Sequence, residues 1–247
     1  MDAGYPPLVA EIFERHQSVR AQIEAAARRS GRDPGLIRLV VVSKKQPVEV
    51  IRAALSAGIR DLGENYAEEA EQKIQALGVV PGLRWHMIGH VQSRKADLVV
   101  RHFDWMHSLD SLKLAMRLER LAAEAGRRLP VLLECNVSGE VSKFGYAAST
   151  PQQWEALAVE ARSIQALPHL EIHGLMTMPP FFEDGEQARP YFRLLRELSA
   201  FMAEKVPQAR WQELSMGTST DFSVAVEEGA TLVRVGTAIL GSRPPNA

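Results

Sequence analysis

Short apolar runs alternate with helical patterns eight times between Leu36 and the C-terminus. The runs are rich in aliphatic residues and bounded by turn residues, as expected for strands of a parallel sheet that is covered on both faces. The expected strands span residues 36–43, 59–63, 83–88, 105–109, 130–137, 170–176, 211–214 and 231–235. The expected helices between them span 47–57, 66–77, 93–101, 111–125, 151–166, 187–205 and 220–228, and a short apolar stretch, 237–240, follows.

An amphipathic pattern over residues 8–29 predicts one further helix before the first strand. Eight strand–helix units after a leading helix are the number of units in a (β/α)8, or TIM, barrel. We therefore predict an α/β fold with one domain, residues 1–247, in which the barrel covers residues 36–241. The leading helix would close the bottom of the barrel or pack on its flank.

A doubly wound open sheet is the competing architecture. It would have fewer strands and a glycine-rich nucleotide-binding turn after the first strand. The segment after the first expected strand reads SKKQP, from Ser43 to Pro47, and contains no glycine. No linker, internal repeat or low-complexity segment divides the 247 residues, which favours the single barrel.

Charge and cysteine content argue against several classes of function. The formal net charge of −1 gives no long-range attraction to nucleic acid or to an anionic membrane surface. The single cysteine, Cys135, cannot form an internal disulfide, and no Cys/His cluster offers a metal site. No apolar stretch approaches the roughly 18–20 residues of a membrane span, and the N-terminus does not resemble a secretory signal. We expect a soluble cytoplasmic protein without nucleic-acid or membrane partners.

Polar residues lie at the carboxyl ends of the expected strands, which face one mouth in a barrel. Lys44 ends the first strand, in the position where ligands of such barrels bind. The alternative is that Lys44 only marks where the strand emerges into solvent. Later strand ends supply Glu64, Asn65, His86, Gly89, Ser108, Asp110, Asn136, Ser138 and Met176.

The last two strand ends predict a phosphate site. The loop after the seventh strand reads SMGTS, from Ser215 to Ser219, and Gly236-Thr237 follows the eighth strand. Small residues let the backbone approach an anion, and hydroxyl and N–H groups at a helix start can donate to it. The alternative is that these small residues serve only as helix caps.

Arg234 lies within an otherwise apolar strand, TLVRVGTAIL, and a buried arginine needs a partner. The partner is either a carboxylate in a structural ion pair or the ring or carboxylate of a ligand. A mouth with a lysine, a phosphate loop and a buried arginine suggests a phosphorylated carbonyl ligand held as a Schiff base. Pyridoxal 5′-phosphate is the common ligand of that kind.

Seven motifs in order resemble those of the YggS/PROSC family of pyridoxal phosphate homeostasis proteins, over about Leu8 to Arg243. They are VVSK (41–44), LGENY (62–66), WHMIGHVQSRK (85–95), NVSGEVSKFG (136–145), GLMTM (174–178), LSMGTSTDF (214–222) and VRVGTAILG (233–241). The resemblance implies the barrel of the alanine racemase N-terminal domain, the fold-type III class. It also implies that Lys44, not Lys45, holds pyridoxal phosphate as a Schiff base.

The same resemblance implies the other cofactor-binding residues. Asn65 and His86 would line the pocket, and Arg234 would face the pyridine nitrogen. A permanently protonated arginine there disfavours a protonated ring and weakens it as an electron sink. The phosphate would be held by Ser215, Gly217, Ser219, Gly236 and Thr237, and Met216 of the same loop is also expected to bind the cofactor.

Three further positions concern the site. Thr218 stands where the family often has methionine, which should alter packing beside the phosphate loop without abolishing binding. His90 stands where proline or asparagine-like residues are familiar. Lys143, on an expected mouth loop, is either a solvated lysine or a guide for the aldehyde or its phosphate.

Two functions from different classes remain open. The first is a carrier or buffer that stores pyridoxal phosphate and passes it to apo-enzymes without strong catalysis. The second is a low-activity amino-acid racemase or lyase that uses Lys44 as a base. Racemisation needs a proton-transfer group on each face of the substrate, and the racemase resemblance supplies the second from a separate β-domain that this sequence does not contain. We therefore favour the carrier and expect a monomer. The near-zero charge disfavours a nucleic-acid or protein-interaction module.

Overall fold

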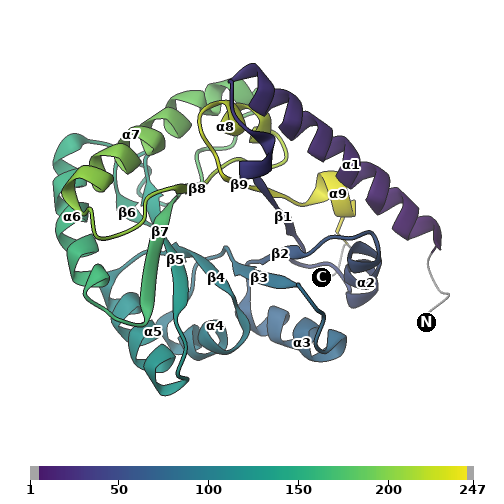
Figure 1. The fold of residues 1–247 in the computed structure, drawn as a ribbon, viewed down its shortest axis with the longest axis horizontal. Coiled ribbons are helices and arrows are strands. Elements are labelled where there is room, and N and C mark those ends of the chain that lie inside the picture. The colour runs from purple at the N-terminus through teal and green to yellow at the C-terminus, as the bar shows by residue number, and fades with distance from the viewer. Residues whose placement is uncertain (1–5, 244–247) are drawn as a thin grey trace.

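The computed structural model describes residues 6–243 and consists of a closed barrel of parallel strands surrounded by helices (Figure 1). The strands are β1 (Arg38–Val42), β2 (Asp61–Glu64), β3 (Arg84–Met87), β4 (Trp105–Leu109), β5 (Leu129–Asn136), β6 (Tyr146–Ala147), β7 (Leu170–Met176), β8 (Glu213–Ser215) and β9 (Leu232–Val235). The strand order is β4-β3-β2-β1-β9-β8-β7-β5, and pairing of β4 with β5 closes the ring. The short strand β6 pairs only with β5.

Helices follow the strands and cover the outside of the barrel. The α-helices are α1 (Pro6–Arg29), α2 (Val48–Ser56), α3 (Ala67–Leu77), α4 (Ala96–His102), α5 (Leu112–Glu124), α6 (Pro151–Gln165), α7 (Arg189–Lys205), α8 (Phe222–Glu227) and α9 (Thr237–Leu240). Three 3₁₀ turns are η1 (Pro34–Leu36), η2 (Ser93–Lys95) and η3 (Gly185–Ala188).

The predicted (β/α)8 barrel is confirmed, including all eight expected strands. The leading helix packs on the flank of the barrel, against α2, α8 and α9, and does not close its bottom (Figure 1). The strand β6 was not predicted, since a two-residue pairing leaves no periodic pattern. The expected helices 93–101 and 187–205 each begin with a 3₁₀ turn, and the apolar stretch 237–240 forms α9.

The core has two parts because each strand is buried on both faces. Outward-facing strand residues such as Val41, Leu62 and Leu133 pack with the inner faces of the helices. A smaller cluster fills the barrel interior: Val40, Leu132, Met176 and Leu232, with Trp105 beside them. This interior leaves room for polar side chains, and those side chains connect to the cavity described below.

Two further observations concern the described residues as a whole. No helix in the range 6–243 is both long and apolar enough to cross a membrane. Within the same range, no three or more His, Cys, Asp and Glu side chains gather in an arrangement that could hold a metal ion. Cys135 is buried as a free thiol.

Candidate functional site

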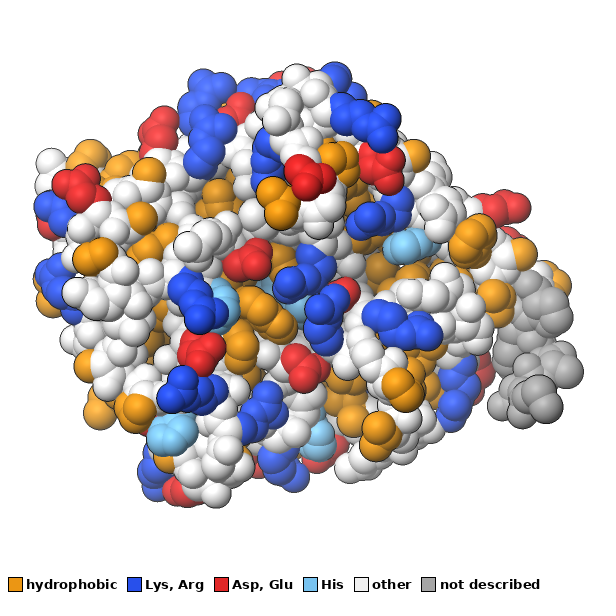
Figure 2. All heavy atoms as spheres, viewed as in Figure 1, with side chains coloured by type: hydrophobic (Ala, Val, Ile, Leu, Met, Phe, Trp, Pro, Cys, Tyr) orange, Lys and Arg blue, Asp and Glu red, His pale blue; other side chains and the backbone are white. Residues whose placement is uncertain are grey.

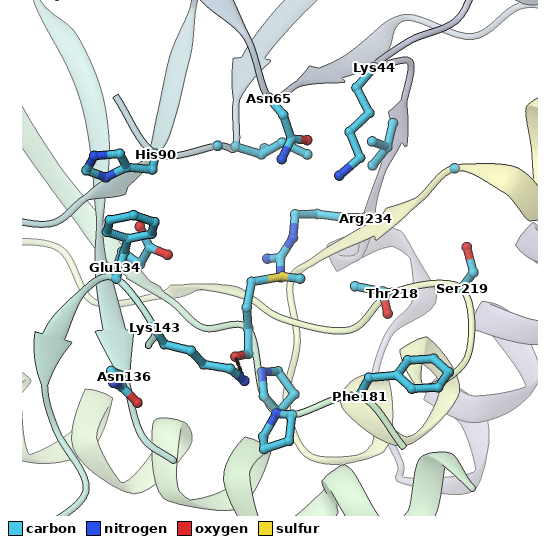
Figure 3. A pocket seen from close by; sticks show the side chains of 18 of the residues that line it. Lys44, Asn65, His90, Glu134, Asn136, Lys143, Phe181, Thr218, Ser219 and Arg234 are labelled. Carbon is cyan, nitrogen blue, oxygen red and sulfur yellow. Dashed lines mark hydrogen bonds between the residues drawn. The ribbon is translucent and has the colours of Figure 1, made fainter. Parts of the chain in front are cut away.

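A cavity of about 680 Å³ opens at the carboxyl ends of the strands (Figure 3). Its volume is in the range of small-molecule and cofactor sites. Residues from β1, β5 and β9 and from the segments that follow β1, β2, β3, β5, β7, β8 and β9 line it. They include Lys44, Asn65, His90, Glu134, Asn136, Lys143, Thr218, Ser219, Arg234, Gly236, Thr237 and Arg243.

Lys44 directs its amine into this cavity from the loop after β1 (Figure 3). Burial lowers the pKa of the Lys44 amine, and the positive charges of Arg243, Arg234 and Lys45 act in the same direction, against the opposing charge of Glu64. A lowered pKa increases the fraction of neutral amine, which is the nucleophilic form. The Lys44 amine therefore lies in the cavity with a larger neutral fraction than an exposed lysine would have.

A buried ion pair beneath Lys44 holds this loop in place. Lys73 donates from Nζ to the Ser43 carbonyl at 2.7 Å, to Glu64 Oε1 at 2.7 Å and to Glu69 Oε1 at 2.6 Å. Glu69 also accepts the backbone N–H of Lys45, whose φ of 60° is unusual for a residue other than glycine. The sequence analysis did not identify Lys73, because a lysine in a helix is ordinarily a surface residue.

Arg234 lies on β9 inside the barrel, directly below the cavity, and is 3% exposed. Its guanidinium donates to Ser215 Oγ and, at 2.8 Å, to the Thr177 carbonyl. Burial lowers the pKa of Arg234 to about 10, so that it remains charged at neutral pH. Among the described residues no carboxylate forms an ion pair with Arg234, so the structural ion pair considered above is not observed.

A chain of hydrogen bonds runs through the barrel from Arg234 to its far end. His107 Nδ1 lies 2.8 Å from Ser215 Oγ, His107 Nε2 lies 3.0 Å from His86 Nδ1, and His86 Nε2 lies 2.9 Å from Asp61 Oδ1. Burial lowers the pKa of both histidines, so each ring carries a single N–H at neutral pH.

The two ends of this chain determine its direction. Burial acts to raise the pKa of Asp61, but hydrogen bonds from His86 and Arg84 hold it below its usual value. The ionised carboxylate only accepts, so His86 must donate from Nε2 and accept at Nδ1. His107 must then donate from Nε2, accept at Nδ1 from the Ser215 hydroxyl, and leave the Ser215 oxygen to accept from Arg234. Every donor in the chain points away from Arg234.

The loops after β8 and β9 form the side of the cavity next to Lys44. Thr218, Ser219, Gly236 and Thr237 lie on its wall, and small residues of this kind let the backbone and hydroxyl groups approach an anion. Gly217 has a φ of 90°, and a Cβ there would lie 2.6 Å from that of Ala225. This turn therefore requires glycine, and it brings the loop backbone close to the cavity.

The opposite side of the cavity carries Glu134, which the sequence analysis did not single out (Figure 3). Burial and then the charge of Asp110 raise the pKa of Glu134 to about 7, although Arg234 acts in the opposite direction. One of its carboxylate oxygens is buried without a hydrogen-bond partner. In the sequence, the only sign that Glu134 belongs to the site is its position as a carboxylate within the apolar run LPVLLECNV.

Lys143 lies on the same side and forms defined contacts. It donates to the Met178 carbonyl at 2.9 Å and forms an ion pair with Glu140 at 2.8 Å (Figure 3). Its side chain is 24% exposed. Lys143 thus connects the loops after β5 and β7 at the cavity.

The structure brings most, but not all, of the expected site residues to one cavity. Lys44, Asn65, Ser219, Arg234, Gly236 and Thr237 line it. The buried Ser215 contacts Arg234 from below. Met216, Gly217 and His86 do not contribute to the lining; Met216 and Gly217 shape the loop, and His86 lies in the barrel interior.

The sequence matches the family model described as "Alanine racemase, N-terminal domain" over residues 16–244. Curated relatives named "Pyridoxal phosphate homeostasis protein" include one from Pseudomonas aeruginosa, with 41% identity across 95% of this chain and 97% of the relative. One from Escherichia coli has 42% identity across 94% and 97%.

Solved structures of PipY from Synechococcus elongatus have the same fold. The form without PLP has a TM-score of 0.83 and 38% identity, and covers 93% of this chain and 100% of PipY. A second PipY structure, with PLP bound, has a TM-score of 0.81 and 37% identity at the same coverage. The chain therefore belongs to the family of pyridoxal phosphate homeostasis proteins, built on the fold of the alanine racemase N-terminal domain.

Proposed function

We propose that this protein binds pyridoxal 5′-phosphate as a Schiff base on Lys44 and acts in the cytoplasm as a carrier or buffer of the cofactor. One observation carries the proposal: a lysine of lowered pKa, a buried arginine and two loops of small hydroxyl and glycine residues share a single cavity. The relatives bear the name of this function.

The residues present fit the cofactor in three respects. Asn65 Oδ1 is buried without a partner at the cavity, and a ligand hydroxyl could donate to it. The Lys44 amine is the nucleophile that an aldehyde requires. Ser219, Gly236 and Thr237 line the cavity, and their hydroxyl and backbone N–H groups are of the kind that can donate to a phosphate.

Each residue then has a defined task. Lys44 would hold the cofactor through its amine, which can condense with an aldehyde and release water. Arg234 would hold the ring nitrogen with a donated hydrogen bond, and the Ser215–His107–His86–Asp61 chain keeps its guanidinium oriented. Bound pyridoxal phosphate can supply an electron sink, but a protonated arginine at the ring weakens that property. This arrangement favours storage over turnover.

A second candidate is a low-activity amino-acid racemase or lyase. Glu134 favours it, because this carboxylate has no hydrogen-bond partner for one oxygen and a pKa near 7, in the same cavity as Lys44. A group with such a pKa can both accept and donate a proton near neutral pH. Glu134 and Lys44 would be the two proton-transfer groups.

The first experiment is borohydride reduction after incubation with pyridoxal phosphate, followed by peptide mass spectrometry. We expect a pyridoxyl adduct on Lys44 that is lost in Lys44→Ala and retained in the matched variant Lys45→Ala. Absence of an adduct with excess pyridoxal phosphate would refute both candidate functions. In the wild type, an adduct on Lys45 or Lys143 in place of Lys44 would refute the assignment of Lys44.

Two further assays separate the candidates. A carrier restores activity to an apo-enzyme that depends on pyridoxal phosphate, and does not exchange the α-proton of amino acids with deuterated solvent. A racemase or lyase shows that exchange, and Glu134→Gln reduces it. We further propose that the protein is a monomer, which light scattering at several protein concentrations tests.

A further inference from the structure

A second cavity lies at the opposite, amino-terminal end of the barrel, between α1, η1 and the first residues of β1, β2 and β3. We call it the amino-end cavity. Its volume is about 460 Å³, which again suits a small molecule. The charged and titratable side chains that line it are His16, Arg20, Arg38, Arg60, Asp61 and Arg84.

The positive charge of this cavity is largely unbalanced. Its one acidic residue, Asp61, is already engaged by Arg84 at 2.7 Å and by His86 at 2.9 Å. Among residues 6–243, Arg20, Arg38 and Arg60 have no carboxylate partner in an ion pair. Arg60 donates only to backbone carbonyls, and the bond of Arg20 to the Ile37 carbonyl is long, at 3.5 Å.

Two side chains have buried polar atoms without any partner. Nη1 of Arg38 is buried and makes no hydrogen bond, although its guanidinium lies 5.3 Å from the centre of the Trp105 ring, which holds it in place. Nδ1 of His16 is also buried and unpartnered. Buried polar atoms of this kind cost free energy unless a partner satisfies them. Figure 2 shows Lys and Arg side chains over the middle of the barrel, with Asp and Glu side chains among them.

We propose that the amino-end cavity binds a phosphate-bearing small molecule. Planar guanidinium groups donate paired hydrogen bonds that match phosphate oxygens, and three arginines without a carboxylate partner line this cavity. A bound anion would offset the repulsion among them. The cavity is separate from the Lys44 cavity, since the two have no lining residue in common.

The test is calorimetric titration of the protein with pyrophosphate, with inorganic phosphate as a smaller probe. We expect saturable binding with a Kd below about 1 mM that weakens as ionic strength rises. Arg38→Met and Arg60→Gln should each weaken it by about tenfold or more. The matched control is Arg128→Gln, which removes an arginine immediately before β5 that is paired with Glu171, and it should leave binding unchanged.

Three outcomes would overturn the proposal. One is the absence of saturable binding to the wild type. Another is equal weakening in Arg128→Gln, which would indicate a non-specific charge effect. The third is full binding in both Arg38→Met and Arg60→Gln, which would place the anion elsewhere, such as the Lys44 cavity. Thermal unfolding without ligand checks that Arg38→Met is folded. If Arg38→Met is unfolded, Arg60→Gln decides the test, because Arg60 is exposed.

Discussion

The raised pKa of Glu134 predicts that this side chain destabilises the protein at alkaline pH. The pKa is about 7 in the folded protein against a usual 4.5, so the folded state binds its proton more tightly than the unfolded state. Stability from this group is therefore present below about pH 4.5 and is lost as pH rises through 7. The full difference corresponds to about 3 kcal/mol, at about 1.4 kcal/mol per pKa unit.

The substitution Glu134→Gln removes the titration and keeps the shape of the side chain. By the same linkage, the variant should exceed the wild type in stability by about 1 kcal/mol at pH 5 and about 3 kcal/mol at pH 8. Urea unfolding of the ligand-free proteins at several pH values measures this difference. Because both proteins contain the same buried histidines, their titration cancels. A difference that does not grow between pH 5 and pH 8 would refute the reasoning.

Two further substitutions test the supports of the site. Gly217→Ala should destabilise the protein by about 2–4 kcal/mol, because a left-handed backbone and a Cβ 2.6 Å from that of Ala225 are both unfavourable. In the matched variant Gly126→Ala, the glycine also has a positive φ, but a Cβ there would meet open space. An equal loss of stability in both variants would exclude the steric clash as the cause. Lys73→Met should cost about 3–5 kcal/mol in urea unfolding, because it leaves the fully buried Glu64 without its counter-ion. Adding Glu64→Gln should recover part of that loss, and no recovery would contradict the ion-pair explanation.

The fold could be predicted because each strand is an apolar run that can be recognised from its local sequence alone. The run around Val40 and Val41 requires burial on both faces, and eight such runs allow few arrangements other than a closed barrel. The positions of Lys44 and Arg234 at the mouth follow from this topology alone. The roles of both residues toward the cofactor remain predictions that the adduct experiment tests.

The remaining parts of the site depend on side-chain direction and on distant partners. His86 occupies a strand end in the sequence, but alternation along β3 directs it into the barrel, where it contacts His107 and Asp61. Glu134 looked like one polar residue within an apolar strand, and its pKa depends on burial that only the assembled barrel produces.

The interior hydrogen-bond chain links the two ends of the barrel in one direction. Asp61 belongs both to this chain and to the amino-end cavity, and its negative charge requires every donor in the chain to point toward it. Ser215 can then only accept from Arg234, so this contact favours the protonated guanidinium. With a pKa of about 10, Arg234 keeps its charge across the physiological range. In the proposed arrangement the ring nitrogen therefore always faces a cation, which is the condition under which the cofactor is held without being activated.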